Sequence, residues 1–510
     1  MTEDFIKFNY CFLRAIGHGR QEKVKMRLLA MLVALASLPL LSSAQNAEEW
    51  PDFPLLNVST VNAEMPTATL VDPPESCFGQ GIVSEYVPGR LVMTLGGKTM
   101  CDTGEYEKGE SGMRIKIRGN TSGAYLDQHP YKLKLSKKAD LLGIDKKLKN
   151  KNWALLSMHA DNKVMRNNES NILPLAGLAV CRALEYPWTP RTRLVNLVLN
   201  GEYQGMYHLI ETVERGDERV ATGKTGFLIE NDAYWWKEGE VYFKTDRQHP
   251  GMGYTFKYPD ADDVDDNIMS AIRDYMNKVE TAVYTHDGVA DYIDYESFAR
   301  WVLCHDILGT LDSGGSNMFL YKESFGEDEP SEAKLKMATP WDFDSILMCG
   351  DTDWGAHHVS VLNYYPELFK EKDFCEQYIA LYKKYRDKVY PYVADYFDNL
   401  KAESGEAFEQ SRTLHRKVYT EEMKSSLDEQ VDDVLSHLKS RLEAFDALVA
   451  DLEEQVSGVD HVTGSESRVL KRRVGIDGAD YTGVSCDNLP QGIYIERCSD
   501  GTARKRMVCK

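Results

Sequence analysis

Two short apolar runs near the middle of the chain, Met318 to Tyr321 and Leu335 to Ala338, have the spacing of a β-hairpin. Four polar residues flank one end of it: Asp312 and Asn317 before the first strand, and Asp342 and Asp344 after the second. Because antiparallel strands place the start of one beside the end of the next, we expect these side chains to converge. Carboxylate and amide oxygens suit Mg²⁺ or Mn²⁺, above all where phosphate groups supply the remaining ligands.

The spacing around this hairpin resembles a pattern used for phosphoryl transfer. Protein kinases place an Asn five residues after a catalytic Asp, then a hairpin, then a metal-binding Asp. Here Asp312, Asn317, the hairpin and Asp342 follow in that order. The alternative interpretation is a polar turn, in which Asp312 and Asn317 cap the Ser-Gly-Gly-Ser loop between them.

Composition limits the classes of partner. The chain has 510 residues, 43% of them apolar, and a formal net charge of −20. This apolar content is typical of a globular protein with a core, and the length suits about two to four domains. The negative charge argues against nucleic acid or an anionic membrane as the main partner.

Residues 23–45 have the pattern of a secretory signal peptide. A basic region over Lys23–Arg27 precedes an apolar run over residues 28–41 and the small residues Ser42-Ser43-Ala44. We predict cleavage near Ala44 and a protein that is secreted, periplasmic or on the cell surface. An internal hydrophobic helix is the alternative. No later stretch is apolar for long enough to cross a bilayer, so we expect no transmembrane span.

The ten cysteines do not have the spacing of a zinc site. In an exported protein they are candidates for disulfides. The pairs nearest in sequence are Cys77 with Cys101 and Cys486 with Cys498.

Alternating apolar and basic residues predict two paired strands, Met113–Arg118 and Tyr131–Leu135, on either side of a turn at Gly119–Gly123. Their basic side chains share one face: Arg114, Lys116, Arg118, Lys132 and Lys134. In an acidic protein, such a face beside a Gly-rich turn is a candidate phosphate site. The alternative is a solvated strand face. A further hairpin is predicted around the Asn200-Gly201 turn.

After Pro259 the pattern becomes helical. Amphipathic spacing predicts helices over residues 268–283 and 295–308, the second capped by Asp294, and two more over 364–400 and 403–455. We therefore predict an α+β protein with a kinase-like, two-lobed fold: a β-rich N-lobe, a helical C-lobe and the acidic hairpin between them. The predicted parts are a leader (1–44), an N-terminal β region (45–110), the kinase-like domain (111–400), a helical extension (401–456), a linker (457–479) and a short β-like tail (480–510).

An ordered series of short motifs over about residues 114–386 resembles the CotH kinase family, atypical kinases named for spore coat protein H. The motifs are Arg118-Gly119-Asn120, Pro130 to Leu135, Leu141-Leu142-Gly143, Arg166-Asn167, Leu199-Asn200-Gly201-x-Tyr203-x-Gly205-x-Tyr207, Gly226-Phe227-Leu228-x-Glu230, Lys257-Tyr258-Pro259-Asp260 and Trp341-Asp342-Phe343-Asp344. The tail resembles the C-terminal sorting domains of some secreted proteins and is a candidate sorting signal.

The resemblance implies a divergent kinase that uses ATP with Mg²⁺ or Mn²⁺ to phosphorylate Ser or Thr hydroxyls of a protein substrate. Asp312 would orient and deprotonate the hydroxyl. The metal ligands would be Asn317, Asp342 and Asp344. Lys134, or Lys132 in its place, would hold the nucleotide phosphates, with Arg118 beside it.

The chain departs from ordinary kinases in three respects. Asp312 follows Thr310-Leu311 where a kinase has His-Arg, and no kinase Gly-rich loop precedes the basic strands. The sequence does not assign the helix glutamate that normally pairs with the lysine, and Glu169 and Glu211 are both candidates. An alternative function is therefore a non-catalytic surface or adhesion protein that keeps the fold. A cation-dependent hydrolase is a third, but it lacks a recognisable nucleophile.

Overall fold

The computed structural model describes residues 53–77, 79–144, 148–158, 171–237, 239–310, 316–326, 329–343 and 363–457, and short segments of the C-terminal part at 470–475, 481–482, 490, 492–498 and 503–508. The predicted leader lies outside these residues. The chain forms two compact units, the first ending at Glu453 and the second beginning at Glu454.

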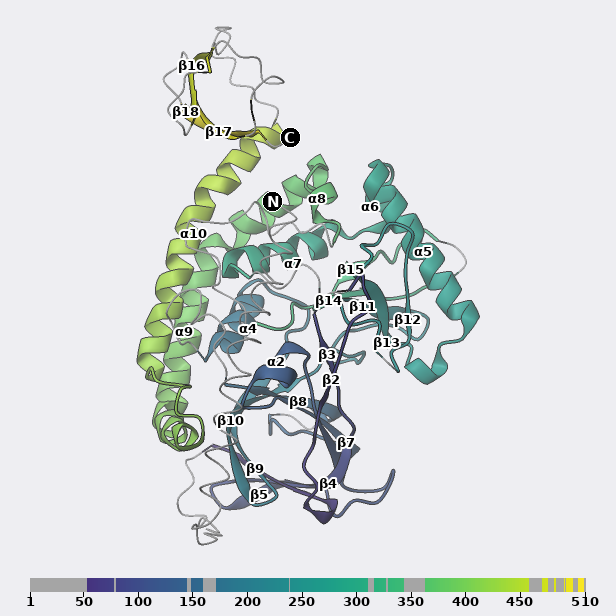
Figure 1. Cartoon of the computed structure of the whole chain (residues 1–510), viewed down its shortest axis with the longest axis vertical. Coiled ribbons are helices and arrows are strands. Elements are labelled where there is room, and N and C mark those ends of the chain that lie inside the picture. The colour runs from purple at the N-terminus through teal and green to yellow at the C-terminus, as the bar shows by residue number, and fades with distance from the viewer. Residues whose placement is uncertain are drawn as a thin grey trace. The chain divides into compact units, whose positions relative to one another are not determined.

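Among the described residues, seven strands of the N-terminal region close into a barrel (Figure 1). Their order is β1-β9-β10-β8-β7-β6-β4, and β4 pairs back onto β1. The β1–β9 pair is parallel and the other pairs are antiparallel. The strands are β1 (Leu55–Thr60), β4 (Val87–Leu95), β6 (Met113–Ile117), β7 (Tyr131–Ala139), β8 (Asn150–Ser157), β9 (Thr192–Leu199) and β10 (Glu202–Glu211), and β5 (Lys98–Asp102) pairs with the end of β4.

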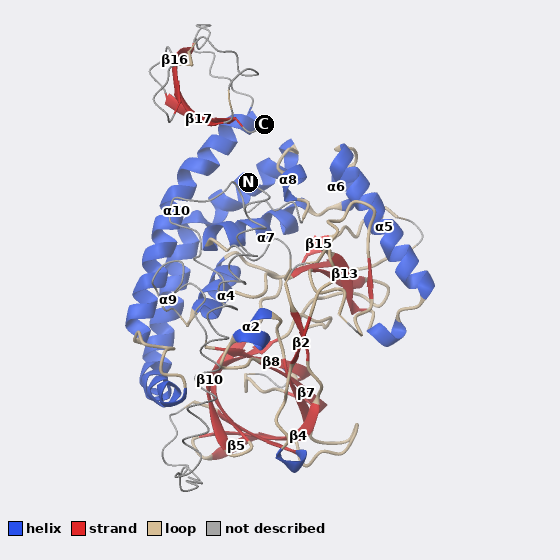
Figure 2. Cartoon of the chain, viewed as in Figure 1, coloured by secondary structure: helices blue, strands red, loops and turns tan. Residues whose placement is uncertain are grey.

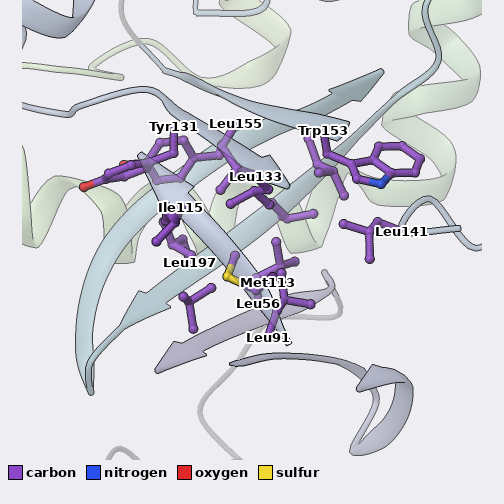
Figure 3. Close-up of a cluster of buried hydrophobic side chains, with 14 of the residues drawn as sticks. Leu56, Leu91, Met113, Ile115, Tyr131, Leu133, Leu141, Trp153, Leu155 and Leu197 are labelled. Carbon is purple, nitrogen blue, oxygen red and sulfur yellow. The ribbon is translucent and has the colours of Figure 1, made fainter. Parts of the chain in front are cut away.

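The barrel closes around an apolar interior supplied by alternate residues of its strands. Met113 and Ile115 of β6 and Leu133 of β7 have no exposed surface, whereas Arg114 and Lys116 between them are half-buried. Figure 3 shows this core, in which Trp153 and Leu155 of β8 pack with them. The predicted pairing of β6 with β7, and the single face for their basic residues, are confirmed.

A second sheet of five antiparallel strands has the order β12-β13-β11-β14-β15. Its strands are β11 (Phe227–Asp232), β12 (Tyr242–Phe243), β13 (Gly253–Tyr258), β14 (Met318–Lys322) and β15 (Lys336–Met337), and β2 (Thr69–Val71) and β3 (Gly81–Val83) form a separate pair. The predicted hairpin of β14 and β15 is confirmed, with Leu320 opposite Met337. The Asn200-Gly201 hairpin is also confirmed, since both turn residues have the positive φ that such a turn requires.

Helices make up most of the described residues after β13 (Figure 2). The described helices before β13 are α2 (Thr121–Tyr125) and α4 (Leu173–Ala183). Those after it are α5 (Asp266–Thr285), α6 (Val289–Tyr292), α7 (Tyr295–Leu308), α8 (Tyr365–Leu368), α9 (Lys372–Val418) and α10 (Leu427–Ser457). Short 3₁₀ turns occur at Val61–Ala63 and Ala261–Asp263. The side chain of Asp294 accepts a hydrogen bond from the backbone N–H of Ser297, so the predicted cap of α7 is confirmed.

Helix α9 differs from its prediction because it continues without a break through residue 401, where two separate helices were expected. The break lies after Val418 instead. Helix α9 packs against α4, α7 and β10, and these contacts hold both halves of the helix against the rest of the first unit.

The second unit contains an antiparallel sheet in the order β16-β17-β18, formed by Leu470–Gly475, Gly492–Cys498 and Ala503–Val508. In the part of the chain that the structure describes, no helix is both long and apolar enough to cross a membrane.

The β-rich N-terminal and helical C-terminal parts of the predicted α+β fold are therefore confirmed. The closed barrel is not part of that prediction. Cys77 and Cys101, one of the two candidate pairs, are not bonded to each other in the structure, in which Cys181, Cys304 and Cys375 are also free thiols.

Candidate functional site

Two of the predicted site residues, Asn317 and Asp342, flank the same end of the β14–β15 hairpin. Asn317 directly precedes β14, and Asp342 follows β15 by five residues. Both have left-handed backbones, with φ of 61° and 66°. Such angles are uncommon outside glycine and often occur at functional sites. The other two, Asp312 and Asp344, lie outside the described residues.

The backbone of Asn317 is tied to a glutamate on the neighbouring strand β11. Its N–H donates to Oε1 of Glu230 at 3.3 Å, and Oε2 of Glu230 lies 2.9 Å from Nζ of Lys257 on β13. Burial raises the pKa of Glu230, and Lys257 opposes this shift. Burial alone would lower the pKa of Lys257, but Glu230 and Asp232 raise it above its usual value. Lys257 therefore remains a cation at the end of the hairpin.

A second carboxylate of β11, Asp232, lies two residues further along. It is 9% exposed and accepts hydrogen bonds from the Thr255 hydroxyl at 3.2 Å and the Tyr234 N–H at 2.7 Å. These donors fix the orientation of the carboxylate. It is one of the charges that act on Lys257.

Basic side chains of the barrel lie close to this carboxylate cluster. The pKa of Lys132 falls from 10.5 to about 8, mainly because the side chain is buried. The positive charges of Lys257, Lys116 and Arg118 contribute to this lowering, and Glu214 opposes it. Lys257 belongs to the second sheet and Lys132 to the barrel, so the two sheets bring their cations together. A concentration of positive charge favours the binding of an anion.

Lys134 occupies a different position along the same strand. It lies opposite Arg114 and Asn152, whereas Lys132 lies opposite Lys116. The charge of Lys132 interacts with those of Arg118 and Lys257.

Two contacts join the barrel to the segments around the second sheet. The guanidinium of Arg118 lies over the ring of Trp341, 5.6 Å from its centroid, and Trp341 directly precedes Asp342. Nζ of Lys237, in the turn after β11, donates to Oδ1 of Asn120 at 2.9 Å. Burial lowers the pKa of Lys237, and the nearby cations Lys116 and Lys257 add to this effect.

The predicted partner glutamate Glu211 is not part of this cluster. It is 1% exposed on strand β10, and its carboxylate pairs with Arg191 at 2.7 Å and with Arg219 at 3.8 Å. Two arginines neutralise Glu211, so this candidate is not the partner of Lys132. Glu169 lies outside the described residues. The carboxylate that acts on Lys132 is Glu214.

Phe343, the residue after Asp342, rests on two helices. A Cβ built on Gly177 of α4 would lie 2.3 Å from the ring atoms Cγ and Cδ1 of Phe343, so the ring lies directly on this glycine. The ring of His305, on α7, has its centroid 6.4 Å from that of Phe343. His305 also contacts the Thr310 hydroxyl through Nδ1, at 3.1 Å. The backbone on both sides of the predicted site is thus supported by α7.

The donor atoms suit a hard cation in kind. Carboxylate and amide oxygens are the ligands that Mg²⁺ and Mn²⁺ prefer. Within the described residues, no group of three or more His, Cys, Asp and Glu side chains could hold a metal. Asn317 and Asp342 would need the predicted ligand Asp344, which lies outside those residues, to complete a site.

The sequence reasoning gave no role to Lys257, Glu230 or Lys237. Lys257 and Glu230 both occur in motifs that carry the family resemblance, so a signal for them was present. Lys237 has no such signal, because only the fold brings it to Asn120.

These features define a mixed α+β protein with a site in which oxygen donors meet a cluster of cations. The sequence profile of the family described as CotH kinase protein matches residues 115–451, more than half of the chain. The chain belongs to the CotH kinase family. The match extends beyond residue 386, where the predicted resemblance ends, into α10. No curated protein matches the chain.

Proposed function

We propose that this chain is an exported CotH-type protein kinase, which transfers the γ-phosphate of ATP to Ser or Thr hydroxyls of a protein substrate with the help of Mg²⁺ or Mn²⁺. The observation that carries the proposal is the meeting of two sets of side chains. Lys132, Lys116 and Arg118 come from the barrel, and Glu230, with Lys257 bound to it, holds the backbone of Asn317 at the acidic end of the hairpin.

Each set would have a separate task. Lys132 and Arg118 would neutralise and orient the nucleotide phosphates, with Lys134 as the less favoured alternative. Asn317, Asp342 and Asp344 would hold the divalent metal, which offsets charge on the transferred phosphoryl group. Asp312 would orient the substrate hydroxyl and accept its proton. Positioning and charge neutralisation account for most of the catalysis of phosphoryl transfer, so these residue types are sufficient in kind.

The two-lobed arrangement forms part of the same proposal. The barrel would act as the β-rich lobe, and α5, α7 and α9 as the helical lobe. The nucleotide would bind where Arg118 contacts Trp341. The predicted leader supports an extracytoplasmic location for the reaction.

The first test is thermal unfolding of the full chain with ATP, with and without Mg²⁺ or Mn²⁺. A ligand that binds only the folded state stabilises it by about 2.7 kcal/mol at a hundredfold excess over its Kd. We expect a metal-dependent rise in melting temperature that is lost in Asp342→Ala and weakened in Lys132→Met. Lys138→Met is the matched control, since Lys138 is an exposed residue of the same strand.

The second step is transfer of labelled γ-phosphate to protein, compared between the wild type and Asp312→Ala. Binding without transfer would point to a nucleotide-binding protein. No stabilisation of the wild type at millimolar ATP would contradict the kinase proposal and favour a non-catalytic surface protein.

A further inference from the structure

Two buried cysteines lie next to each other between helices α4 and α7. The sulfurs of Cys181 and Cys304 are 3.6 Å apart, and neither residue has exposed surface. They are 123 residues apart in the sequence. Adjacent buried thiols also occur simply as small apolar side chains in a core, so the pair needs a further argument.

The position of the pair distinguishes it from two thiols that only fill space in a core. Cys181 lies one helical turn after Gly177, and Cys304 directly precedes His305. Gly177 and His305 both lie close to the ring of Phe343. The two sulfurs therefore join the helices at the level where they support the segment containing Asp342.

The other described cysteines have no such partner among the described residues. Cys77 and Cys101 are free and half-buried, and Cys375 donates to the carbonyl oxygen of Phe369 at 3.2 Å. Within the described part of the chain, Cys181 and Cys304 are thus the cysteines whose sulfurs contact each other.

We propose that Cys181 and Cys304 form a disulfide that fixes α4 against α7 beneath Phe343. The oxidant is a small-molecule disulfide such as oxidised glutathione. One cysteine thiolate attacks it, releases one glutathione thiol and forms a mixed disulfide. The second thiolate then attacks the cysteine sulfur of that intermediate and releases the second glutathione thiol. The protein loses two protons and two electrons, and one glutathione disulfide becomes two thiols.

Because the native pair is buried, the reaction takes place while the chain folds or opens locally. A bond across so long a loop restricts the unfolded chain strongly, and is expected to stabilise the folded state. The proposal is independent of nucleotide binding, since it concerns only sulfur chemistry and stability.

The experiment treats the full chain with oxidised glutathione in urea concentrations just below its unfolding midpoint, and a second sample with dithiothreitol. Both samples are alkylated in denaturant and digested without reduction, and the peptides are identified by mass spectrometry. We expect a peptide pair linked through Cys181 and Cys304 in the oxidised sample. The melting temperature of the oxidised protein should exceed that of the reduced protein by a few degrees.

Two variants separate this bond from other oxidation. Cys304→Ala should abolish the rise in melting temperature on oxidation, whereas Cys375→Ala should retain it. The wild-type peptides decide the matter even if a variant fails to fold. Alkylation of both Cys181 and Cys304 after oxidation, or a glutathione adduct that persists on either, would overturn the proposal.

Discussion

At the scale of single residues, Lys132 has the most unusual environment of the candidate site. It is a lysine whose pKa falls to about 8, because burial and the charges of Lys257, Lys116 and Arg118 all disfavour its protonated form. A group of this kind makes the stability of the fold depend on pH.

The direction of this pH dependence follows from the number of protons that the folded and unfolded chains bind. Between about pH 8 and pH 10.5 the unfolded chain carries the proton on Lys132 and the folded chain does not. The unfolded state then binds more protons, so the free energy of unfolding rises with pH over this window. Below about pH 8 both states are protonated, and the unfavourable charge is fully present.

We predict that Lys132→Met is more stable than the wild type at pH 7, and that this advantage shrinks between pH 8 and pH 10.5. Urea unfolding at a series of pH values measures both effects. Lys138→Met provides the baseline for loss of an exposed lysine from β7. If the difference between wild type and Lys132→Met does not change with pH, the assigned environment of Lys132 is wrong.

The residues themselves were only partly predictable. The hairpin and the alternation of β6 and β7 pointed to Asn317, Asp342, Arg118 and Lys132, because local pattern decides which side chains share a strand end or a face. The choice between Lys132 and Lys134 depends on Lys257, which lies on another sheet. Similarly, Glu211 was a reasonable candidate until the fold placed two arginines against it.

At the scale of elements, the support of Phe343 by α4 depends on a glycine in the middle of a helix. Glycine usually weakens a helix interior relative to alanine, so its presence needs a reason. At Gly177 the reason is the ring of Phe343, which occupies the space of a side chain. Gly405 of α9 has no neighbour within 4 Å of a Cβ and so no such reason.

We therefore predict opposite effects for the same substitution in two helices. Gly177→Ala should destabilise the fold by about 1–3 kcal/mol, as expected for overpacking, and should weaken metal-dependent nucleotide binding because it displaces Asp342. Gly405→Ala should stabilise the fold by about 0.5–1 kcal/mol. Chemical unfolding of the two variants tests the pair, and a stabilising Gly177→Ala would contradict the described contact.

The same scale shows why some elements were predicted and others were not. Asp294 and the Asn200-Gly201 turn act through hydrogen bonds and backbone angles of a few neighbouring residues, so sequence alone identified them. The continuity of α9 depends on tertiary contacts. Nδ1 of His415 accepts a hydrogen bond from the backbone N–H of Met206 at 3.1 Å, and the hydroxyl of Ser411 accepts one from the side-chain amide of Asn196 at 2.9 Å. Met206 and Asn196 belong to the barrel strands β10 and β9.

At the scale of the whole molecule, these contacts bear on where the folded unit ends. His415 and Ser411 of α9 form hydrogen bonds with barrel residues, and Arg386 of α9 forms an ion pair with Asp446 of α10 at 2.7 Å. The first compact unit ends at Glu453. A domain that ended at residue 400, as predicted, would lack the C-terminal part of α9 and all of α10.

We predict that a chain ending after Ser457 keeps the melting temperature and cooperativity of the full chain, and that a chain ending after Leu400 does not fold cooperatively. Removing α10 and the end of α9 exposes the apolar and polar partners they cover. Thermal unfolding by circular dichroism distinguishes the two. Cooperative unfolding of the shorter chain would show that α10 is a separate addition.

The pairing of β1 with β9, which closes the barrel, also determines when the molecule is able to fold. β1 closes the ring against β9, and the N–H of Thr60 donates to the side chain of Asn200, 140 residues away. At about 5–20 residues per second, synthesis of that interval takes on the order of ten seconds. During this time the early strands present unpaired edges, which are templates for pairing with other chains. The newborn chain, rather than the finished protein, is therefore the form most in need of a chaperone.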